Sequence, residues 1–322
     1  MAPSTESVGT VHIDQLLSNL ARLYRPTQFI ADMVCPYLDV NNESDLYPIF
    51  TQGDFYGTDV DDLVADRAEP RLVDISHTNA RYETKRRELA WDISDRERKN
   101  ADSQLNLERN KQLAVMGRLM LKREIRVAAL LRKTTNGGGL TNGVSAPSNA
   151  VWNSSTLAGI EADVFTGRES LRQAIGIRPN LVIIPEAVAA ALSGNTNFAG
   201  GLMVYTYGDV NQQPLLSEYY PSVPAVLWGM KTVLPGLIEN TANEGQAESY
   251  SDVWGKNVVL LYVTGGPALD NPSVAYTFRS EGLTTRTEYQ QKPRKTWYAV
   301  GQTIDEEVVA PNAGYEITGA CT

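Results

Sequence analysis

The chain has 322 residues, of which 42% are hydrophobic and 21% charged, and its formal net charge is −9. A chain of this length and composition can bury a large core, which excludes disorder as its dominant state. The negative charge argues against general affinity for nucleic acid, because such binding needs many Lys and Arg side chains opposite phosphates. Any contact with DNA should be weak or local.

No segment of the sequence resembles a membrane span or an export signal. The longest apolar runs, such as Val258–Val263, are far too short to cross a bilayer, and the first residues lack a basic segment followed by an apolar one. The two cysteines, Cys35 and Cys321, are expected to be plain thiols in a reducing compartment. We therefore expect a protein that is neither exported nor bound to a membrane.

The N-terminal part is predicted to consist of pieces too small to form a core of their own. Residues 1–10 are small and polar, and a short amphipathic helix is predicted to begin at Asp14, with Ile13 on its apolar face, and to stop at Pro26. A second short apolar stretch, Phe29–Val34, follows. These pieces should pack on the body of the chain or on a neighbour.

The next segment is predicted to be a long hairpin. Leu46–Phe50 leads out as a strand, Gly53–Asp66 is a polar loop, and Val73–Ile93 returns with β-type residues between polar ones. A long two-stranded hairpin buries little surface and is marginal by itself. Something outside it should hold it down.

A long helix is predicted to follow. Ser94 begins a capping box with Glu97, and a helical pattern runs from Ala101 to Lys133, about 50 Å at roughly 1.5 Å per residue. Apolar residues recur on one face of this helix. The polar residues expected on its other faces are Lys111, Arg118, Lys122, Arg123, Glu124 and Arg126.

The C-terminal half has the pattern of a compact α/β unit with long loops. Thr134–Ala150 is predicted to be a loop because it is rich in Gly, Asn, Thr and Ser. Helices are expected over Ile160–Ile175, ending near Gly176, and over Glu186–Leu192. Strands are expected at Leu181–Ile184, Val258–Val263, Val274–Phe278, Thr296–Val300 and Tyr315–Thr318.

The residues that could form a catalytic, nucleotide or metal site do not have the spacing that such motifs require. Gly137–Gly143 fits neither dinucleotide nor P-loop patterns, and Gly143–Pro147 fails the nucleophile elbow at its last position. The only histidines, His12 and His77, lack metal-ligand spacing, and Glu306 and Glu307 are adjacent on a strand, so they should point to opposite faces. We expect no cofactor, no metal and no enzymatic activity.

The order of parts nevertheless resembles a known family, the major capsid proteins of tailed bacteriophages with the Johnson fold first seen in the Hong Kong phage shell. No single piece is specific, but their order covers nearly the whole chain. The segments that carry the resemblance are Phe29–Pro36 and Tyr47–Phe50, Trp91–Glu97, Arg123–Leu131, Ile177–Pro185, Trp254–Tyr262, and Glu307–Pro311 with Gly314–Ile317.

The resemblance implies an α+β fold with an N-terminal arm, an extended β-hairpin loop, a long spine helix in a peripheral domain, and an α/β axial domain. The implied ranges are 1–45 for the arm, 46–93 for the extended loop, 94–150 for the peripheral domain, 151–282 for the axial domain, 283–311 for return strands of the peripheral domain, and 312–322 for a C-terminal strand.

The resemblance also implies a shell subunit that assembles with itself into hexamers and pentamers of an icosahedral phage head enclosing double-stranded DNA. The extended loop would lie over a neighbour's peripheral domain. Separate scaffolding, portal and cement proteins are the other expected partners, with assembly in the host cytoplasm and a final location in the virion. Expected intersubunit contacts are Tyr47 and Phe50, the acidic residues Asp59, Asp61 and Asp62, and the basic residues Lys85, Arg86, Lys292, Arg294 and Lys295.

The chain also departs from its relatives. Many of them carry a long N-terminal scaffolding helix, which this sequence lacks, so scaffolding is expected to be separate or unnecessary. Lys85 lies where some relatives crosslink, but no motif identifies the Asn and Glu of that reaction, so no such role is carried over. The alternatives are an encapsulin-like compartment, a soluble α/β hydrolase or nucleotide enzyme, and a decoration or tail protein.

Overall fold

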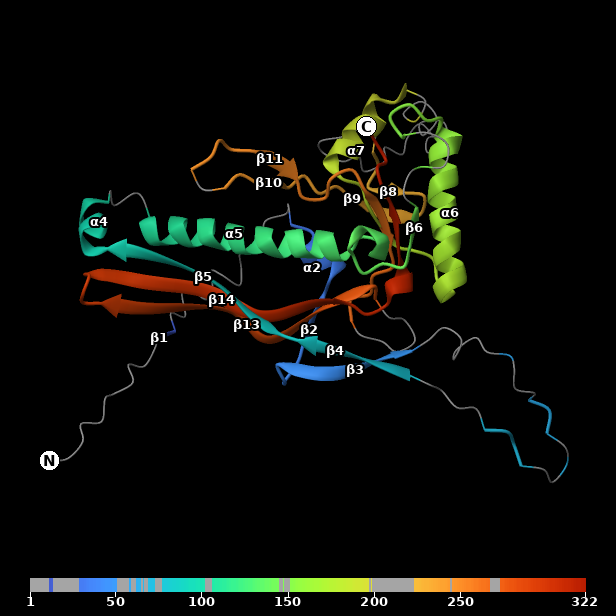
Figure 1. Cartoon of the computed structure of the whole chain (residues 1–322), viewed down its shortest axis with the longest axis horizontal. Helices are drawn as coiled ribbons and strands as arrows, with labels where there is room; N and C mark the ends of the chain where they lie inside the picture. Colours follow the sequence, from blue (N-terminus) through green and yellow to red (C-terminus); the bar gives the residue numbers. More distant parts are fainter. Residues whose placement is uncertain are drawn as a thin grey trace, which may run out of the picture.

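A computed structural model of the chain shows an elongated molecule (Figure 1). It describes residues 12–13, 29–50, 58, 62–64, 66, 69–72, 77–101, 106–144, 147, 151–196, 198, 223–243, 245–266 and 273–322. The helix predicted to begin at Asp14 lies outside these residues. His12 and Ile13 form the short strand β1 (His12–Ile13), so the assignment of Ile13 to that helix is wrong.

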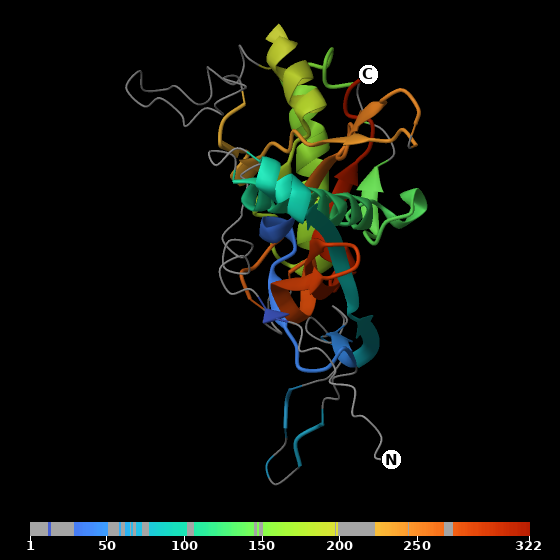
Figure 2. The same cartoon turned by 90° about the vertical axis from the view of Figure 1, so that its left-hand side faces the viewer.

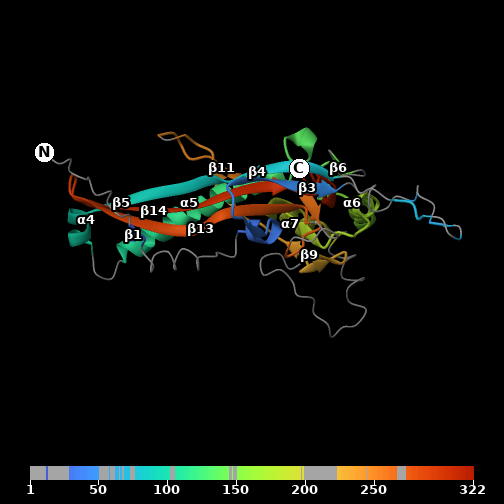
Figure 3. The same ribbon diagram turned by 90° about the horizontal axis from the view of Figure 1, so that it is seen from below.

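A long, narrow sheet runs the length of one side of the molecule (Figure 3). Its centre is the antiparallel pair β13 (Ala275–Gln290) and β14 (Lys295–Val308), joined by a tight turn at 291–294. β5 (Lys85–Ser94) pairs with β14, while β1 and β2 (Tyr37–Asp39) pair with β13. The residue pattern predicted only the first part of each of these two strands, at Val274–Phe278 and Thr296–Val300, while the resemblance placed return strands over 283–311.

The long helix α5 (Leu107–Leu130) packs along this sheet, as Figure 2 shows in a view nearly down the helix axis. The prediction that Ser94 caps a helix is confirmed, because Ser94 Oγ accepts the Glu97 N–H at 3.1 Å. The helix that it caps is the short α4 (Asp95–Asn100). Ala101 is extended, with a ψ of 135°, so one helix from Ala101 to Lys133 is a wrong prediction. α5 is about 36 Å long rather than 50 Å.

The predicted hairpin divides differently from the expectation. β3 (Ser44–Phe50) pairs with β4 (His77–Glu83), and the next strand, β5, leaves the hairpin to join the long sheet. The return segment is therefore two strands in two sheets, separated at Thr84. In Figure 1 the hairpin of β3 and β4 points away from the end of the molecule that carries α4.

A second sheet forms the other part of the molecule. Within the described residues it has six strands in the order β6-β15-β12-β7-β9-β8. Their bounds are Asn142–Val144 (β6), Gly314–Ile317 (β15), Val258–Leu261 (β12), Leu181–Ile183 (β7), Met230–Val233 (β9) and Val226–Leu227 (β8). The strands expected at Leu181–Ile184, Val258–Val263 and Tyr315–Thr318 are confirmed, and the structure places them next to one another in this sheet.

The helices α6 (Leu157–Ile175) and α7 (Glu186–Gly194) belong to this second part, and both match their predictions closely. Thr156 caps α6, and Gly176 ends it in the left-handed conformation with a φ of 73°, as its sequence position indicated. The remaining elements are α2 (Ala31–Val34), a hairpin of β10 (Ile238–Asn240) and β11 (Tyr250–Asp252), and the 3-10 turns η1 (Thr134–Asn136) and η2 (Pro311–Ala313).

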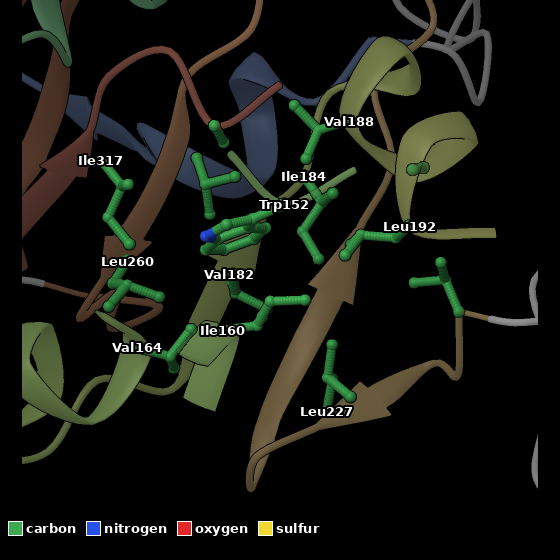
Figure 4. Packing of buried hydrophobic residues seen from close by; sticks show 14 of the residues in the cluster. Trp152, Ile160, Val164, Val182, Ile184, Val188, Leu192, Leu227, Leu260 and Ile317 are labelled. Carbon is green, nitrogen blue, oxygen red and sulfur yellow. The ribbon is translucent and has the colours of Figure 1, made fainter. Parts of the chain in front are cut away.

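The central strands of the second sheet are buried on both faces. Alternate residues such as Val182 and Leu260 face a core with Trp152, Ile160 and Val164 under α6 and α7 (Figure 4). The residues between them, such as Leu181 and Leu261, face another core built from α2, the C-terminal end of α5 and the start of β13. This second core joins the two parts of the molecule.

Candidate assembly surfaces

The end of the molecule that carries α4 is held together by ion pairs between α4 and α5 and between β5 and β14. Lys111 of α5 contacts Glu97 of α4 at 2.7 Å, and Arg98 of α4 contacts Glu108 of α5 at 2.8 Å. Lys295 contacts Asp92 of the neighbouring strand at 2.8 Å. The acids at this end are thus largely engaged by cations of their own chain.

Five other cations at this end remain exposed, and we call them the basic end. They lie on α4, on the first turn of α5 and on the turn between β13 and β14. Among the described residues, none of the five has an acidic partner within ion-pair distance. They are Arg96, Lys99, Arg109, Lys292 and Arg294.

The basic end extends a prediction made from the sequence. Lys292 and Arg294 are exposed in the turn, whereas Lys295 is half-buried and pairs within the chain. Arg96 and Lys99 were missed because a charged run in a short helix has no distinctive sequence pattern. Their proximity to the turn arises from strand pairing, which places Lys295 opposite Ser94.

At the other side, aromatic stacking attaches the hairpin of β3 and β4 to the long sheet. The ring of Phe278 on β13 stacks on the ring of Tyr82, with 4.5 Å between the ring centroids, and its centroid lies 5.2 Å from that of the Tyr47 ring. The Glu83 N–H donates to Asp305 Oδ2 on β14 at 2.9 Å. Tyr47, predicted to contact a neighbour, is therefore half-buried against its own chain at the base of the hairpin.

Carboxylates gather under this hairpin base. Burial, followed by the charges of Asp305 and Glu306, raises the pKa of Glu307 to about 7. Burial also raises the pKa of Tyr47 to about 12, with Glu307 and Asp305 adding to the effect. A carboxyl group beside other carboxylates loses its proton less readily than an isolated one, because its negative charge would repel theirs. We therefore expect the contact between β14 and the hairpin of β3 and β4 to depend on pH.

The neighbouring Glu306 points to the opposite face of β14, as predicted for adjacent strand residues. Its carboxylate forms two hydrogen bonds with Arg126 of α5, at 3.1 and 2.6 Å. One strand thus presents Glu306 to the helix and Glu307 to the hairpin.

The other predicted contact residues fall at several places. Lys85 and Arg86 are exposed at the start of β5, and Arg86 contacts Glu88 at 3.0 Å. Asp62 is exposed, whereas Asp59 and Asp61 lie outside the described residues. Phe50 ends β3, and only its backbone is described.

A buried polar cluster joins α2 to α5, and the sequence did not predict it. Glu124 accepts the N–H groups of Ile30 at 3.2 Å and Ala31 at 2.9 Å, and also Trp254 Nε1 at 2.9 Å. Its neighbour Arg123 forms an ion pair with Asp32. Both side chains are buried, whereas the sequence pattern placed them on the faces of the helix outside its apolar stripe.

The geometry explains why Arg123 and Glu124 are buried. Arg123 donates to the carbonyl oxygen of Cys35 at 3.3 Å and to Thr277 Oγ1 at 3.1 Å, and its guanidinium lies 4.4 Å from the centre of the Tyr37 ring. Burial raises the pKa of Glu124, which its N–H donors oppose. The cluster therefore fixes the entering chain to the long helix and to β13.

The described residues offer no group of three His, Cys, Asp or Glu side chains placed to bind a metal ion. The helices described here are also too short or too polar to cross a bilayer.

Comparison with solved structures defines the class of fold. A phage-related protein from Bordetella bronchiseptica RB50 superposes with a TM-score of 0.67 at 18% identity, covering 97% of this chain and 98% of that one. The capsid of cyanophage P-SCSP1u superposes with a TM-score of 0.61 at 11% identity, covering 99% of this chain and 92% of that one. The mature capsid of bacteriophage PhiM1 superposes with a TM-score of 0.60 at 8% identity, covering 92% of this chain and 87% of that one. The chain has the fold of phage capsid proteins.

A sequence relative makes the comparison more specific. The major capsid protein of Burkholderia phage BcepMu is 25% identical over 282 residues, covering 84% of each chain. No family model matches the chain. In sequence and in fold, this protein resembles the major capsid proteins of bacteriophages, as the order of its segments indicated.

Proposed function

We propose that this protein is the major capsid protein of a bacteriophage, a shell subunit without enzymatic activity that assembles with itself into the hexamers and pentamers of an icosahedral head. The head encloses double-stranded DNA, assembles in the host cytoplasm and remains in the virion. The similarity to a phage major capsid protein over 84% of the chain supports this function most directly.

The shape of the chain supports self-assembly on physical grounds. The hairpin of β3 and β4 extends from the body and carries an exposed Leu46, and the segment beyond it exposes Leu63 and Leu72 at 81% and 96%. A neighbouring subunit that covers these side chains removes their apolar surface from water, which stabilises the contact between subunits. This hairpin corresponds to the extended loop, which lies over the peripheral domain of a neighbour.

The domain ranges are proposed on the same basis. Residues 1–45 form the arm, 46–93 the extended loop, 94–150 and 283–311 the peripheral domain, 151–282 the axial domain, and 312–322 the last strand. The axial domain gathers at the symmetry axes. Portal, cement and any scaffolding proteins are its further partners, and packaged DNA makes only weak contacts because the chain is acidic.

Electron microscopy in negative stain and light scattering of the purified protein test the proposal, with and without a co-expressed scaffold. Closed shells or uniform capsomers are expected, and the shell diameter separates a phage head from a small compartment. A monomer under every condition would contradict the function.

A truncated variant tests the role of the extended loop. Replacing residues 51–76 by a short turn should abolish shells while the circular dichroism spectrum of the subunit is retained. Shells of normal yield from this variant would show that the loop is dispensable for assembly.

A further inference from the structure

The hairpin of β10 and β11 projects from the part of the molecule that contains the second sheet. Its base is fixed, because the Val253 N–H donates to the carbonyl oxygen of Leu237 at 3.0 Å and Val253 is buried. Its outer loop is closed by Asn240, whose Oδ1 accepts the N–H groups of Ala242 at 3.0 Å and Ser249 at 3.2 Å. Most residues beyond the base are exposed. A two-stranded hairpin with so little to bury is marginal by itself, so a partner that covers it would stabilise it.

One face of this hairpin carries apolar side chains beside acidic ones. The strand register places Ile238 opposite Asp252 and Asn240 opposite Tyr250, so these four side chains share a face. Ile238 is 53% exposed and Tyr250 is 59% exposed. The charge of the hairpin is entirely negative, because residues 237–253 contain no Lys or Arg. The acids in this range are Glu239, Glu244, Glu248 and Asp252.

A surface of complementary character lies on α6. Phe165 is 48% exposed there, and the guanidinium of Arg168 lies 5.4 Å from the centre of its ring. Arg178, shortly after the end of the helix, is also exposed. Arg172 of the same helix pairs with Glu169. Within the part of the chain that the structure describes, neither Arg168 nor Arg178 has a carboxylate within ion-pair distance.

The positive charge of Arg168 and Arg178 is therefore poorly compensated. Burial lowers the pKa of Arg168 and the charge of Arg178 lowers it further, so the two cations repel each other. Arg168 Nε is buried and has no hydrogen-bond partner among the described residues. Of the three acids in residues 157–178, Asp163 is buried and Glu169 is already paired, which leaves only Glu161. An external carboxylate beside the two arginines would lower the energy of this surface.

The hairpin and α6 lie on opposite sides of the second sheet. Figures 1 and 3 show α6 at one side of this sheet and the strands β10 and β11 directed away from the other side. The hairpin of one chain therefore does not reach α6 of the same chain. A contact between these unlike surfaces joins two copies, and its repetition about an axis closes a ring.

We propose that the hairpin of β10 and β11 docks on α6 of a second copy of this chain. Ile238 and Tyr250 cover the exposed ring of Phe165. The acids of the hairpin pair with Arg168 and Arg178. The contact deepens the proposed function, on which it rests, by naming the two surfaces that join neighbouring axial domains within a capsomer. Apolar anchors at the centre and charged groups at the rim are the usual composition of such an interface.

Charge reversal in the full-length chain tests the proposal. The variant Glu248→Lys/Asp252→Lys reverses the hairpin, and Arg168→Glu/Arg178→Glu reverses the surface of α6. Each is expected to lower the yield of capsomers and shells at least about tenfold, because like charges then face each other. Combining all four substitutions in one chain restores opposite charges and should restore assembly.

A matched control separates this contact from a general effect of net charge. Arg118→Glu/Lys122→Glu changes the charge by the same amount as the α6 variant, on the exposed face of α5, and should assemble like the unmodified chain. The proposal is overturned if this control blocks assembly equally, if either reversal alone assembles normally, or if the fourfold variant fails to recover.

Chemical crosslinking keeps the contact testable even without shells. The native cysteines, Cys35 and Cys321, are buried, so Phe165→Cys/Ile238→Cys offers two new accessible thiols to a bismaleimide reagent. The double variant should give a ladder of covalent multimers on a denaturing gel. An equal mixture of the two single variants should stop at dimers, because each chain then carries only one of the two thiols.

The outcomes of crosslinking separate the contact from the proposed function. A ladder from a protein that forms no shells would mean that the capsid function fails and the contact stands. Shells of the double variant without a ladder overturn the contact alone, and the absence of both shells and crosslinks overturns both.

Discussion

At the scale of single residues, β14 shows how one strand performs two tasks. Glu306 faces α5 and pairs with Arg126 at 2.6 Å, while Glu307 faces the base of the hairpin, where burial and neighbouring acids raise its pKa to about 7. Because successive strand residues point to opposite faces, adjacent glutamates occupy different environments. One of them strengthens the link between helix and sheet, and the other makes the hairpin contact depend on pH.

The raised pKa of Glu307 gives a prediction with a definite sign. The folded state binds this proton more tightly than the unfolded chain, whose carboxyl pKa is near 4.5. Protonation therefore stabilises the fold, and the contribution is lost as the pH rises from about 4.5 to about 7. Glu307→Gln should become more stable relative to the unmodified chain over that range, as measured by urea unfolding at several pH values.

The exposed Glu288 of β13 is the matched control for this experiment. The stability of Glu288→Gln relative to the unmodified chain should change little between pH 4.5 and 7. A stability difference for Glu307→Gln that is constant across this range would refute the assignment.

At the scale of elements, the contact between α6 and the second sheet depends on a helix position without a side chain. A Cβ at Gly167 would lie 2.6 Å from Leu260 Cδ1 and 2.8 Å from Tyr315 Cδ1. These distances are shorter than a normal van der Waals contact, so the helix backbone approaches β12 and β15 only because this residue is glycine.

Substitution at Gly167 tests the close approach. Gly167→Ala should destabilise the fold by about 1–3 kcal/mol, because the added methyl group displaces packed side chains. Gly194→Ala, at the end of α7, is the control, since a Cβ there meets nothing within 4 Å. It should be neutral or stabilising by up to about 1 kcal/mol, because alanine favours the helix. Equal losses for both variants in urea unfolding would contradict the packing argument.

At the scale of the whole molecule, the elongated shape does not divide into independently folding parts. A continuous buried cluster contains Val34 of α2, Val127 of α5, Val259 of β12 and Ala275 of β13. Both sheets lose apolar contacts if either part unfolds alone, so we expect the subunit to unfold as one unit.

Unfolding of the unassembled subunit checks this expectation. The urea transitions recorded by far-ultraviolet circular dichroism and by tryptophan fluorescence should coincide. Val259→Ala, in the shared cluster, should move both midpoints together and lower the stability by about 1–3 kcal/mol. Two separated transitions would mean that the sheets are independent.

The sequence by itself determined the elements whose signals are local. The cap at Ser94, the end of α6 at Gly176, the helix α7 and the central strands of the second sheet depend on neighbouring residues, and they are found as predicted. The similarity to the fold of phage capsid proteins also followed from the order of segments along the chain, and the solved capsid structures bear out that similarity.

Tertiary structure alone decided the features that depend on contacts distant in sequence. The register between β13 and β14 shifts between Arg279 and Thr284, so the alternation of apolar and polar residues is interrupted and only the strand ends were recognisable. The sequence pattern placed Glu124 outside the apolar stripe of the helix because its side chain is charged. It is buried because α2 presents N–H groups to it from more than ninety residues away. Local sequence patterns specify backbone conformation. The pairing of strands and the burial of side chains depend instead on which distant segment packs against them, and only the folded chain brings those segments together.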